Sequence, residues 1–225
     1  MVDSPTKARL APADAAMLGL ATSVTQDPWA VERADYERAR AAGLGDGTIL
    51  QAVVLSAYFN YLNRVADAVD IELDYESALP RPDRDALREP VPRPSRARWP
   101  TAAPFPLRLA DRPVTAEAFE RWRAHVLERE SPLSRRDRAV LARAVAWSLC
   151  DGWTVDALGD AAPRSPREEG LAGYAEVLTA TPWRLNEEHL QGLRGLGLDD
   201  RGLLDVISVA SFQNTASRLR LVLAE

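Results

Sequence analysis

Two stretches of the chain resemble each other at a distance of 154 positions. Residues 12–69 align with residues 166–223 without a gap, and thirteen of the 58 aligned positions are identical. A chain of this composition would give roughly 8% identity by chance, or about five matches. The identical pairs include Pro12/Pro166, Trp29/Trp183, Gly43/Gly197, Asn60/Asn214 and Arg64/Arg218. A supersecondary unit that occurs twice must keep its helix ends and its buried polar groups, so we predict two tandem related repeats.

Helix signals dominate both stretches. Pro12 and Pro166 suit the first position of a helix, where the N–H that proline lacks would have no partner. Ser165, directly before Pro166, is a favourable N-cap residue. The pairs Asp27-Pro28 and Thr181-Pro182 repeat the same arrangement and predict the start of the next helix. Gly43 and Gly197 are expected where that helix ends in a left-handed residue.

The third helix of each copy is the most apolar. Asp46 and Asp200 are its predicted N-caps, and residues 49–69 carry apolar side chains on nearly every face. A helix of this kind is buried, either inside its own domain or between subunits. The expected fold is therefore all-α, with three helices in each copy.

The region between the copies has a different composition. Eight of the sixteen prolines lie between Ser77 and Pro106, which indicates an extended linker. We predict an N-terminal half-repeat over residues 1–78, a proline-rich linker over 79–114 and a C-terminal domain over 115–225. Two extra helices are expected at the start of that domain, one from Thr115 and one from the Ser134/Asp137 capping box to the vicinity of Cys150.

Composition excludes several functions. A net charge of −5 and a pI near 5.3 argue against nucleic acid or an anionic membrane as the main partner. No segment is long and apolar enough to cross a bilayer, and Met1 to Leu10 lack the apolar core of a signal peptide. The single cysteine, Cys150, excludes an intramolecular disulfide and a multi-cysteine metal site. We expect a cytoplasmic protein without a metal or cofactor.

Three segments carry a resemblance to a known family. They are residues 44–73, above all the phrase FNYLNRVAD at 59–67, residues 20–29 (LATSVTQDPW) and residues 133–140 (LSRRDRAV). In these segments the chain resembles the peroxidase-related branch of the carboxymuconolactone decarboxylase and alkylhydroperoxidase (AhpD-like) family. The resemblance implies an AhpD-like helical bundle, a homo-oligomer and an antioxidant oxidoreductase of the alkylhydroperoxidase type.

The catalytic motif of that family is degenerate here. Its members use a Cys-x-x-Cys-x-x-x-His element with a glutamate about three turns upstream. By this resemblance Cys150 takes the place of the first cysteine, whereas the second cysteine falls at Trp153 and the histidine at Ala157. The glutamate falls at or near Ala139, with Asp137 as the closest acid. Cys150 is therefore the one candidate catalytic residue.

The sequence leaves the role of Cys150 open among a buried structural residue, a one-cysteine redox site and an intermolecular disulfide. Asp151 and the end of the preceding helix both disfavour a thiolate. A break at Gly152 followed by a new helix from Thr154 would have the opposite effect, because a helix N-terminus lowers the pKa of a thiol.

A polar stripe on the apolar third helix is the second candidate site. It comprises Asn60, Asn63, Arg64 and Asp67 in the first copy, and Asn214 and Arg218 in the second. In the structural interpretation Arg64 pairs with Asp67 or another carboxylate and Asn60 binds a backbone group, because a buried arginine needs partners. In the functional interpretation the stripe lines the substrate cleft of the family. Leu221 replaces Asp67 in the second copy, so Arg218 would need a carboxylate from elsewhere.

These observations support two main hypotheses about function. The first is an AhpD-like peroxide-reducing enzyme with an incomplete active site. The second is a catalytically inactive helical oligomerisation subunit or scaffold, which pairs with itself or with an active paralogous AhpD-like subunit. A decarboxylase-type enzyme is the third hypothesis, and no convergent acid–base set in the sequence supports it.

Overall fold

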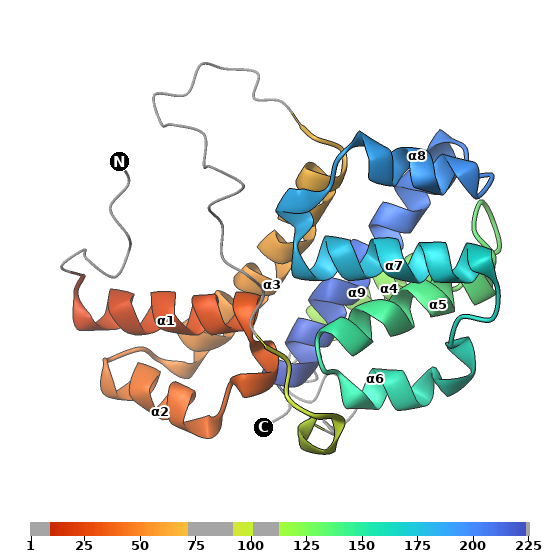
Figure 1. Cartoon of the computed structure of the whole chain (residues 1–225). Coiled ribbons are helices and arrows are strands. Elements are labelled where there is room, and N and C mark those ends of the chain that lie inside the picture. Colours follow the sequence, from red (N-terminus) through yellow and green to blue (C-terminus); the bar gives the residue numbers. More distant parts are fainter. Residues whose placement is uncertain (1–9, 72–91, 101–112, 224–225) are drawn as a thin grey trace.

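The computed structural model describes residues 10–71, 92–100 and 113–223 (Figure 1). Within these ranges the chain forms nine α-helices, four short 3₁₀ helices and no β-strand, so the protein is all-α as predicted. None of these helices combines the length and the apolar character needed to cross a membrane.

Helix bounds recur along the chain at one constant offset. The first set is α1 (Pro12–Gln26), η2 (Pro28–Ala30), α2 (Arg33–Ala41) and α3 (Asp46–Ala68). The later set is α7 (Pro166–Ala180), η5 (Pro182–Arg184), α8 (Glu187–Gly195) and α9 (Asp200–Val222). Every one of these elements begins and ends 154 residues after its counterpart, which is the spacing of the sequence alignment.

Between the two sets lie η3 (Arg96–Arg98), α4 (Pro113–Leu127), α5 (Arg135–Ser148), the short α6 (Gly152–Ala157) and η4 (Gly159–Ala161). Helices α4 and α5 pack on α9, and α5 also packs along α7. In Figure 1 the red and orange helices α1 and α2 lie on one side and the green to blue helices on the other, with α3 and α9 between them.

The long helices α3 and α9 pack against each other and join the two sides of the molecule. Leu219, Val222 and Leu223 from α9 and its C-cap complete the N-terminal core, which also contains Val24 and Val53. In return, Ala68 of α3 belongs to the larger C-terminal core. Each half of the chain therefore contributes apolar side chains to the core of the other half.

Several helix ends form as the sequence predicts. Pro12 and Pro166 are the first residues of α1 and α7, and the Ser165 hydroxyl accepts a hydrogen bond from the N–H of Glu168. Ser134 caps α5 in the same way, through the N–H of Asp137. Gly43 and Gly197 follow α2 and α8 with positive φ angles of 94° and 82°.

The predicted start of the second helix in each copy is wrong. Pro28 and Pro182 open a single 3₁₀ turn rather than an α-helix, and neither Asp27 nor Thr181 makes a side-chain cap. The α-helices begin a few residues later, where better caps are present. Glu32 forms a capping box with Asp35 in front of α2. Asn186 accepts from the N–H of His189 in front of α8.

The predicted N-caps of the third helix also shift by one residue. Asp46 and Asp200 are the first helical residues, and the caps are Gly45 and Asp199. Each of the two aspartates instead forms an ion pair with the arginine six residues before it, Arg40–Asp46 at 2.7 Å and Arg194–Asp200 at 2.6 Å. At the first helical position a carboxylate still favours the helix through its positive N-terminal end.

Most of the predicted linker over 79–114 lies outside the described residues. Two of its described residues, 113 and 114, begin α4, which therefore starts two residues before the predicted Thr115. The other described residues, 92–100, contain η3 and Trp99, which is only 9% exposed. The Trp99 ring meets the ring of Trp147 edge to face, with centroids 4.8 Å apart, and its indole N–H donates to the carbonyl of Pro94. This piece of chain therefore packs on α5.

Candidate functional site

Cys150 lies in the turn between α5 and α6. Helix α5 ends at Ser148, Cys150 has a positive φ of 58°, and Asp151 caps α6 from Gly152 onward. A new helix thus follows the cysteine, beginning two residues earlier than the Thr154 start considered from the sequence. Positive φ is uncommon for a residue with a side chain, so the packing around this turn must hold it in place.

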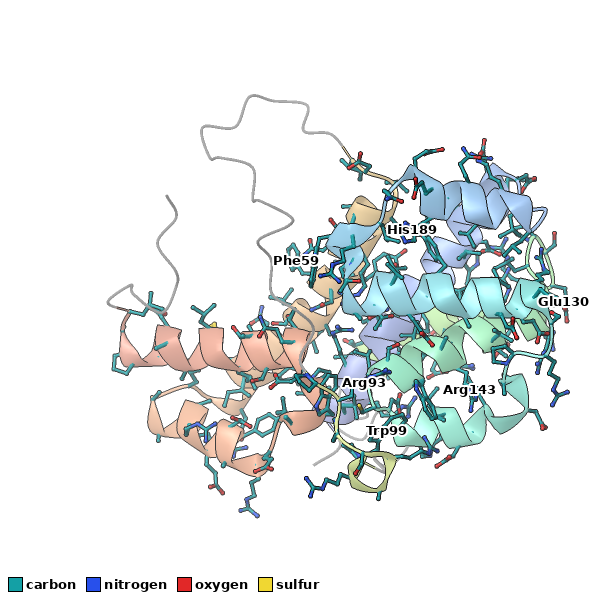
Figure 2. All side chains as sticks on the ribbon, in the orientation of Figure 1. Phe59, Arg93, Trp99, Glu130, Arg143 and His189 are labelled. Carbon is teal, nitrogen blue, oxygen red and sulfur yellow. The ribbon has the colours of Figure 1, made fainter. Side chains whose placement is uncertain are left out.

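The thiol of Cys150 is completely buried. Its neighbours in the apolar cluster include Trp99, Ala146 and Val155. Burial raises the pKa of Cys150 from 9.0 to about 11, although the charge of Arg93 acts in the opposite direction. In Figure 2, Arg93 and Trp99 lie together on the segment that crosses this region. At neutral pH the group is a protonated thiol in an apolar environment.

Asp151 is the centre of a buried polar network that sequence reasoning missed. Its carboxylate accepts hydrogen bonds from the N–H and the hydroxyl of Thr154, at 3.0 and 2.6 Å, and from the Ser217 hydroxyl at 2.8 Å. Arg220 completes the network with an Nε–Oδ2 distance of 3.4 Å and lies 4.1 Å above the Trp153 ring. The sequence signal was the Asp-Gly-Trp-Thr turn, in which an aspartate caps the helix three residues before a threonine.

The network fixes the turn rather than activating Cys150. Asp151 uses both carboxylate oxygens as hydrogen-bond acceptors, and Arg220 balances its charge. Burial lowers the pKa of Arg220, and the charge of Asp151 acts against that shift. The exposed fractions of the two side chains are 1% for Asp151 and 11% for Arg220, so the pair is protected from water.

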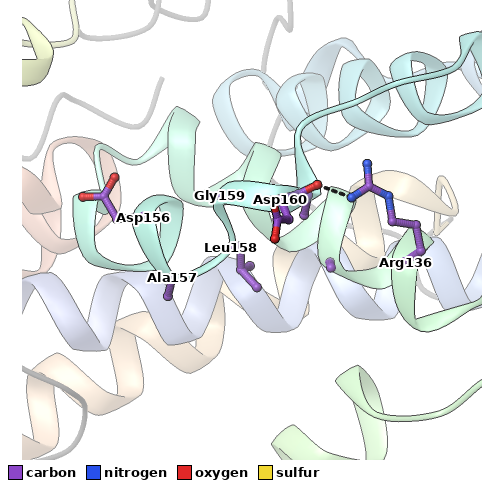
Figure 3. Close-up of a pocket in the computed structure, with 8 residues that line it drawn as sticks. Arg136, Asp156, Ala157, Leu158, Gly159 and Asp160 are labelled. Carbon is purple, nitrogen blue, oxygen red and sulfur yellow. Dashed lines mark hydrogen bonds between the residues drawn. The ribbon is translucent and has the colours of Figure 1, made fainter.

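Two positions of the degenerate family motif meet in one pocket. Ala139 and Ala157, where the resemblance places the glutamate and the histidine, both line a pocket of about 370 Å³ beside α6 (Figure 3). Its other lining residues are Arg136, Asp156, Leu158, Gly159, Asp160 and Ala161. Cys150 is not among them, and the lining contains neither a thiol nor an imidazole.

The polar groups around that pocket are already engaged. Arg136 donates to both carboxylate oxygens of Glu168, at 2.9 and 3.0 Å, and to the carbonyl oxygens of Asp160 and Ala162. The hydrogen bond from Arg136 lowers the pKa of Glu168 to about 2. Asp137, the acid closest to the missing glutamate, pairs with Arg167 at 3.3 Å. Trp153, at the position of the second cysteine, is 36% exposed beneath Arg220.

The predicted polar cluster divides into a buried group and an outer group. Asn60, Arg64, Asn214 and Arg218 are each at most 5% exposed and lie at the centre of the molecule. Asn63 is exposed and Asp67 is partly buried, so the structure does not bring them into the same central group.

Each buried arginine binds its own asparagine and a carbonyl of the other half. Nη1 of Arg64 donates to Oδ1 of Asn60 at 2.6 Å, and Nη2 donates to the carbonyl of Thr179 at 2.9 Å. Arg218 repeats this arrangement with Asn214 at 2.6 Å and the carbonyl of Thr25 at 3.1 Å. The two asparagines in turn donate to the hydroxyls of Thr25 and Thr179, both at 3.0 Å.

Carbonyl oxygens accept hydrogen bonds from both arginines. The charge of Asp67 also favours the charged form of Arg64, as the structural interpretation of the sequence expects. Burial lowers the pKa of Arg64 to about 10 and that of Arg218 well below its ordinary value, and the positive charge of Arg64 lowers the latter further. The two positive charges repel each other, so it is the hydrogen bonds from Arg64 to Thr179 and from Arg218 to Thr25 that join the halves, and they use these side chains structurally.

Among the residues that the structure describes, no three His, Cys, Asp or Glu side chains gather closely enough to hold a metal ion. Comparisons with family models, with curated proteins and with solved structures gave no match. The likeness to AhpD-like proteins therefore rests on the residues of this chain alone.

Proposed function

We propose that this protein is an AhpD-like helical subunit that has kept the fold and lost the dithiol chemistry, and that it acts through assembly with itself or with an active paralogous subunit. The observation that carries the proposal is the environment of Cys150. Its side chain is fully buried, and burial raises its pKa to about 11. The chain contains no second cysteine that could resolve an oxidised sulfur.

Peroxide reduction by a dithiol enzyme has three requirements. A thiolate must attack the peroxide, a second thiol must reduce the sulfenic acid, and a base must keep the first thiol ionised. Raising the pKa of Cys150 by two units lowers the thiolate fraction at neutral pH about 100-fold. Alanines at the two motif positions that meet in the pocket of Figure 3 supply neither a base nor a proton relay. An alkylhydroperoxidase-type activity is therefore the weaker proposal.

In this proposal the helices α1–α3 and α7–α9 arose by duplication of one three-helix unit. The common offset of the helix bounds and the reciprocal Arg64 and Arg218 hydrogen bonds both support it. In this proposal the pair of related units takes the place of two AhpD-like chains, with α3 and α9 at the join. The polar residues of the join stabilise the fold and take no part in chemistry.

Thiol accessibility tests the proposal. The folded protein at pH 7.5 is treated with hydrogen peroxide or an alkyl hydroperoxide and a dithiol donor, and the mass of the Cys150 peptide is followed over time. We expect no sulfenic, sulfinic or sulfonic product in the folded protein, and rapid reaction of the same thiol with a disulfide reagent after unfolding in guanidinium. Peroxide consumption that is lost in Cys150→Ser would refute the proposal.

A further inference from the structure

An apolar surface lies on the outer side of α1 and α3. It consists of six side chains that are 38–54% exposed, and we call it the α1–α3 face: Leu18, Leu55, Tyr58, Phe59, Leu62 and Val69. The α3 members follow the spacing of one helix face, and Figure 2 shows Phe59 at the outer edge of α3. Exposed apolar residues are ordinary singly, whereas a contiguous patch indicates a binding surface.

The same positions in the second half of the chain are all buried. The counterparts of the six residues are 0–8% exposed: Ala172, Val209, Phe212, Gln213, Ala216 and Leu223. Helices α4 and α5 pack on α9, and α5 packs on α7, at this side of the molecule. The rings of Phe119 and Trp122 lie 5.4 and 4.7 Å from the ring of Phe212, whereas Leu223 is buried in the N-terminal core. Among the described residues no helix covers the α1–α3 face in the way that α4 and α5 pack on α7 and α9.

The α1–α3 face is not simply a vacant site for a helix like α5. Buried Arg138 of α5 binds Asp205 of α9, and Asp137 binds Arg167 of α7. In the first half Gln51 stands at the position of Asp205 and Ala13 at the position of Arg167, so neither ion pair could form there. Asp14 stands at the position of Glu168, which binds Arg136, and it is the one acid that is kept. Phe59 meanwhile replaces the buried Gln213. Compared with the equivalent surface of α7 and α9, the α1–α3 face has fewer charged side chains that could bind a helix like α5, and it has one additional aromatic ring.

The charge pattern of α3 favours a second copy as the partner. In a two-fold contact the groups nearest the axis meet their own copies, so a charge there would face a like charge. From Gly47 to Asn63 the helix has no Asp, Glu, Lys or Arg, in a chain that is 27% charged. The six side chains expose on the order of 500 Å² of apolar surface, which suits the apolar core of a standard interface of about 800 Å² per partner.

We propose that the α1–α3 face is a homodimer interface, in which α3 packs against α3 of a second copy around a two-fold axis. The inference rests on the proposed function, since it names the surface through which the subunit assembles. Phe59 and Tyr58 are its central contacts, because large aromatic side chains at the centre of an interface carry most of the binding energy.

The test uses the full chain in sedimentation velocity and light scattering from about 1 to 100 µM. We expect the wild type to be a dimer and Phe59→Lys to raise its dissociation constant at least 30-fold. Leu204→Lys is the matched control, because Leu204 is a single exposed leucine, 58% exposed, on α9. The control should remain dimeric, and circular dichroism should show both variants folded. A monomeric wild type at 100 µM, or a dimer that tolerates Phe59→Lys, overturns the inference.

Cross-linking supplies a direct readout of position. Asn63 is exposed beside Phe59 and Leu62, and the native Cys150 is buried, so Asn63→Cys provides one reactive thiol per chain. A flexible bismaleimide should join two Asn63→Cys chains, and should not join chains of the Arg201→Cys control, whose site is exposed on α9. Equal cross-linking at both sites counts against this interface. If Cys150 reacted with peroxide, the proposed loss of dithiol chemistry would be refuted, but the dimer measurements would not change. Failure of the proposed function can therefore be distinguished from failure of the proposed interface.

Discussion

At the scale of single residues, Cys150 shows how burial decides the chemistry of a group. Its pKa is raised, so the folded state holds a proton that the unfolded chain releases between pH 9 and about 11. The stabilising effect of the protonated thiol is therefore complete below pH 9 and is lost as the pH rises towards 11.

We predict that wild type loses on the order of 2–3 kcal/mol more free energy of unfolding between pH 8.5 and 11 than Cys150→Ala does. Urea denaturation of both proteins across this range measures the difference. Because the other titrating groups are shared, they cancel in the comparison. Parallel pH profiles for the two proteins would mean that the thiol ionises freely and is accessible to water.

Sequence reasoning identified the central residues of the molecule and not their partners. Periodicity placed Arg64 and Arg218 on buried helices, and elementary electrostatics required each of them to find acceptors. The acceptors include carbonyls 115 and 193 residues away, on α7 and α1. Such contacts depend on how the halves pack, which no local pattern encodes. The same limit hid the Asp151 network, whose Ser217 and Arg220 come from α9.

At the scale of elements, local signals located most helix ends, but they misplaced the starts of α2 and α8 by several residues and the N-caps of α3 and α9 by one residue. The prolines at 12 and 166 begin helices because their N–H would be unsatisfied there in any case. Pro28 and Pro182 have the same property and yet give only a 3₁₀ turn, and the side-chain caps that form are those of Glu32 and Asn186, four residues later. Competing caps at this distance are ranked by the tertiary structure as well as by the sequence.

Gly43 and Gly197 provide a test of local backbone control. Both have positive φ, and a Cβ added at either position would meet no atom within 4 Å, so the cost of an alanine is conformational alone. We expect Gly43→Ala and Gly197→Ala each to lower the free energy of unfolding by about 1–2 kcal/mol. Gly192→Ala, inside α8 with the same open surroundings, should raise it by about 0.5–1 kcal/mol. Urea midpoints of the three variants check the signs, and stabilisation by either positive-φ substitution would contradict the explanation.

At the scale of the whole molecule, side chains of each half form hydrogen bonds with the backbone of the other half. Arg64 donates to a carbonyl of the second half, and Arg218 donates to a carbonyl of the first half. Thr215 donates to the carbonyl of Ala57 at 3.0 Å, and Tyr36 donates to the carbonyl of Val222. Apolar residues are exchanged as well, since the end of α9 completes the N-terminal core. These contacts join the predicted units 1–78 and 115–225, and they favour joint unfolding of the two halves.

This exchange leads to a prediction about cooperativity. Val53 is fully buried in the N-terminal core and its counterpart, Ile207, is 3% exposed in the C-terminal core. If the halves unfold together, Val53→Ala and Ile207→Val should each shift one common transition, by about 2 and about 1 kcal/mol respectively. Tryptophan fluorescence and far-ultraviolet circular dichroism should give coincident curves for both variants and for the wild type. Two separate transitions, with Val53→Ala moving only the first, would show that each half folds alone and that the Arg64 and Arg218 contacts join finished domains.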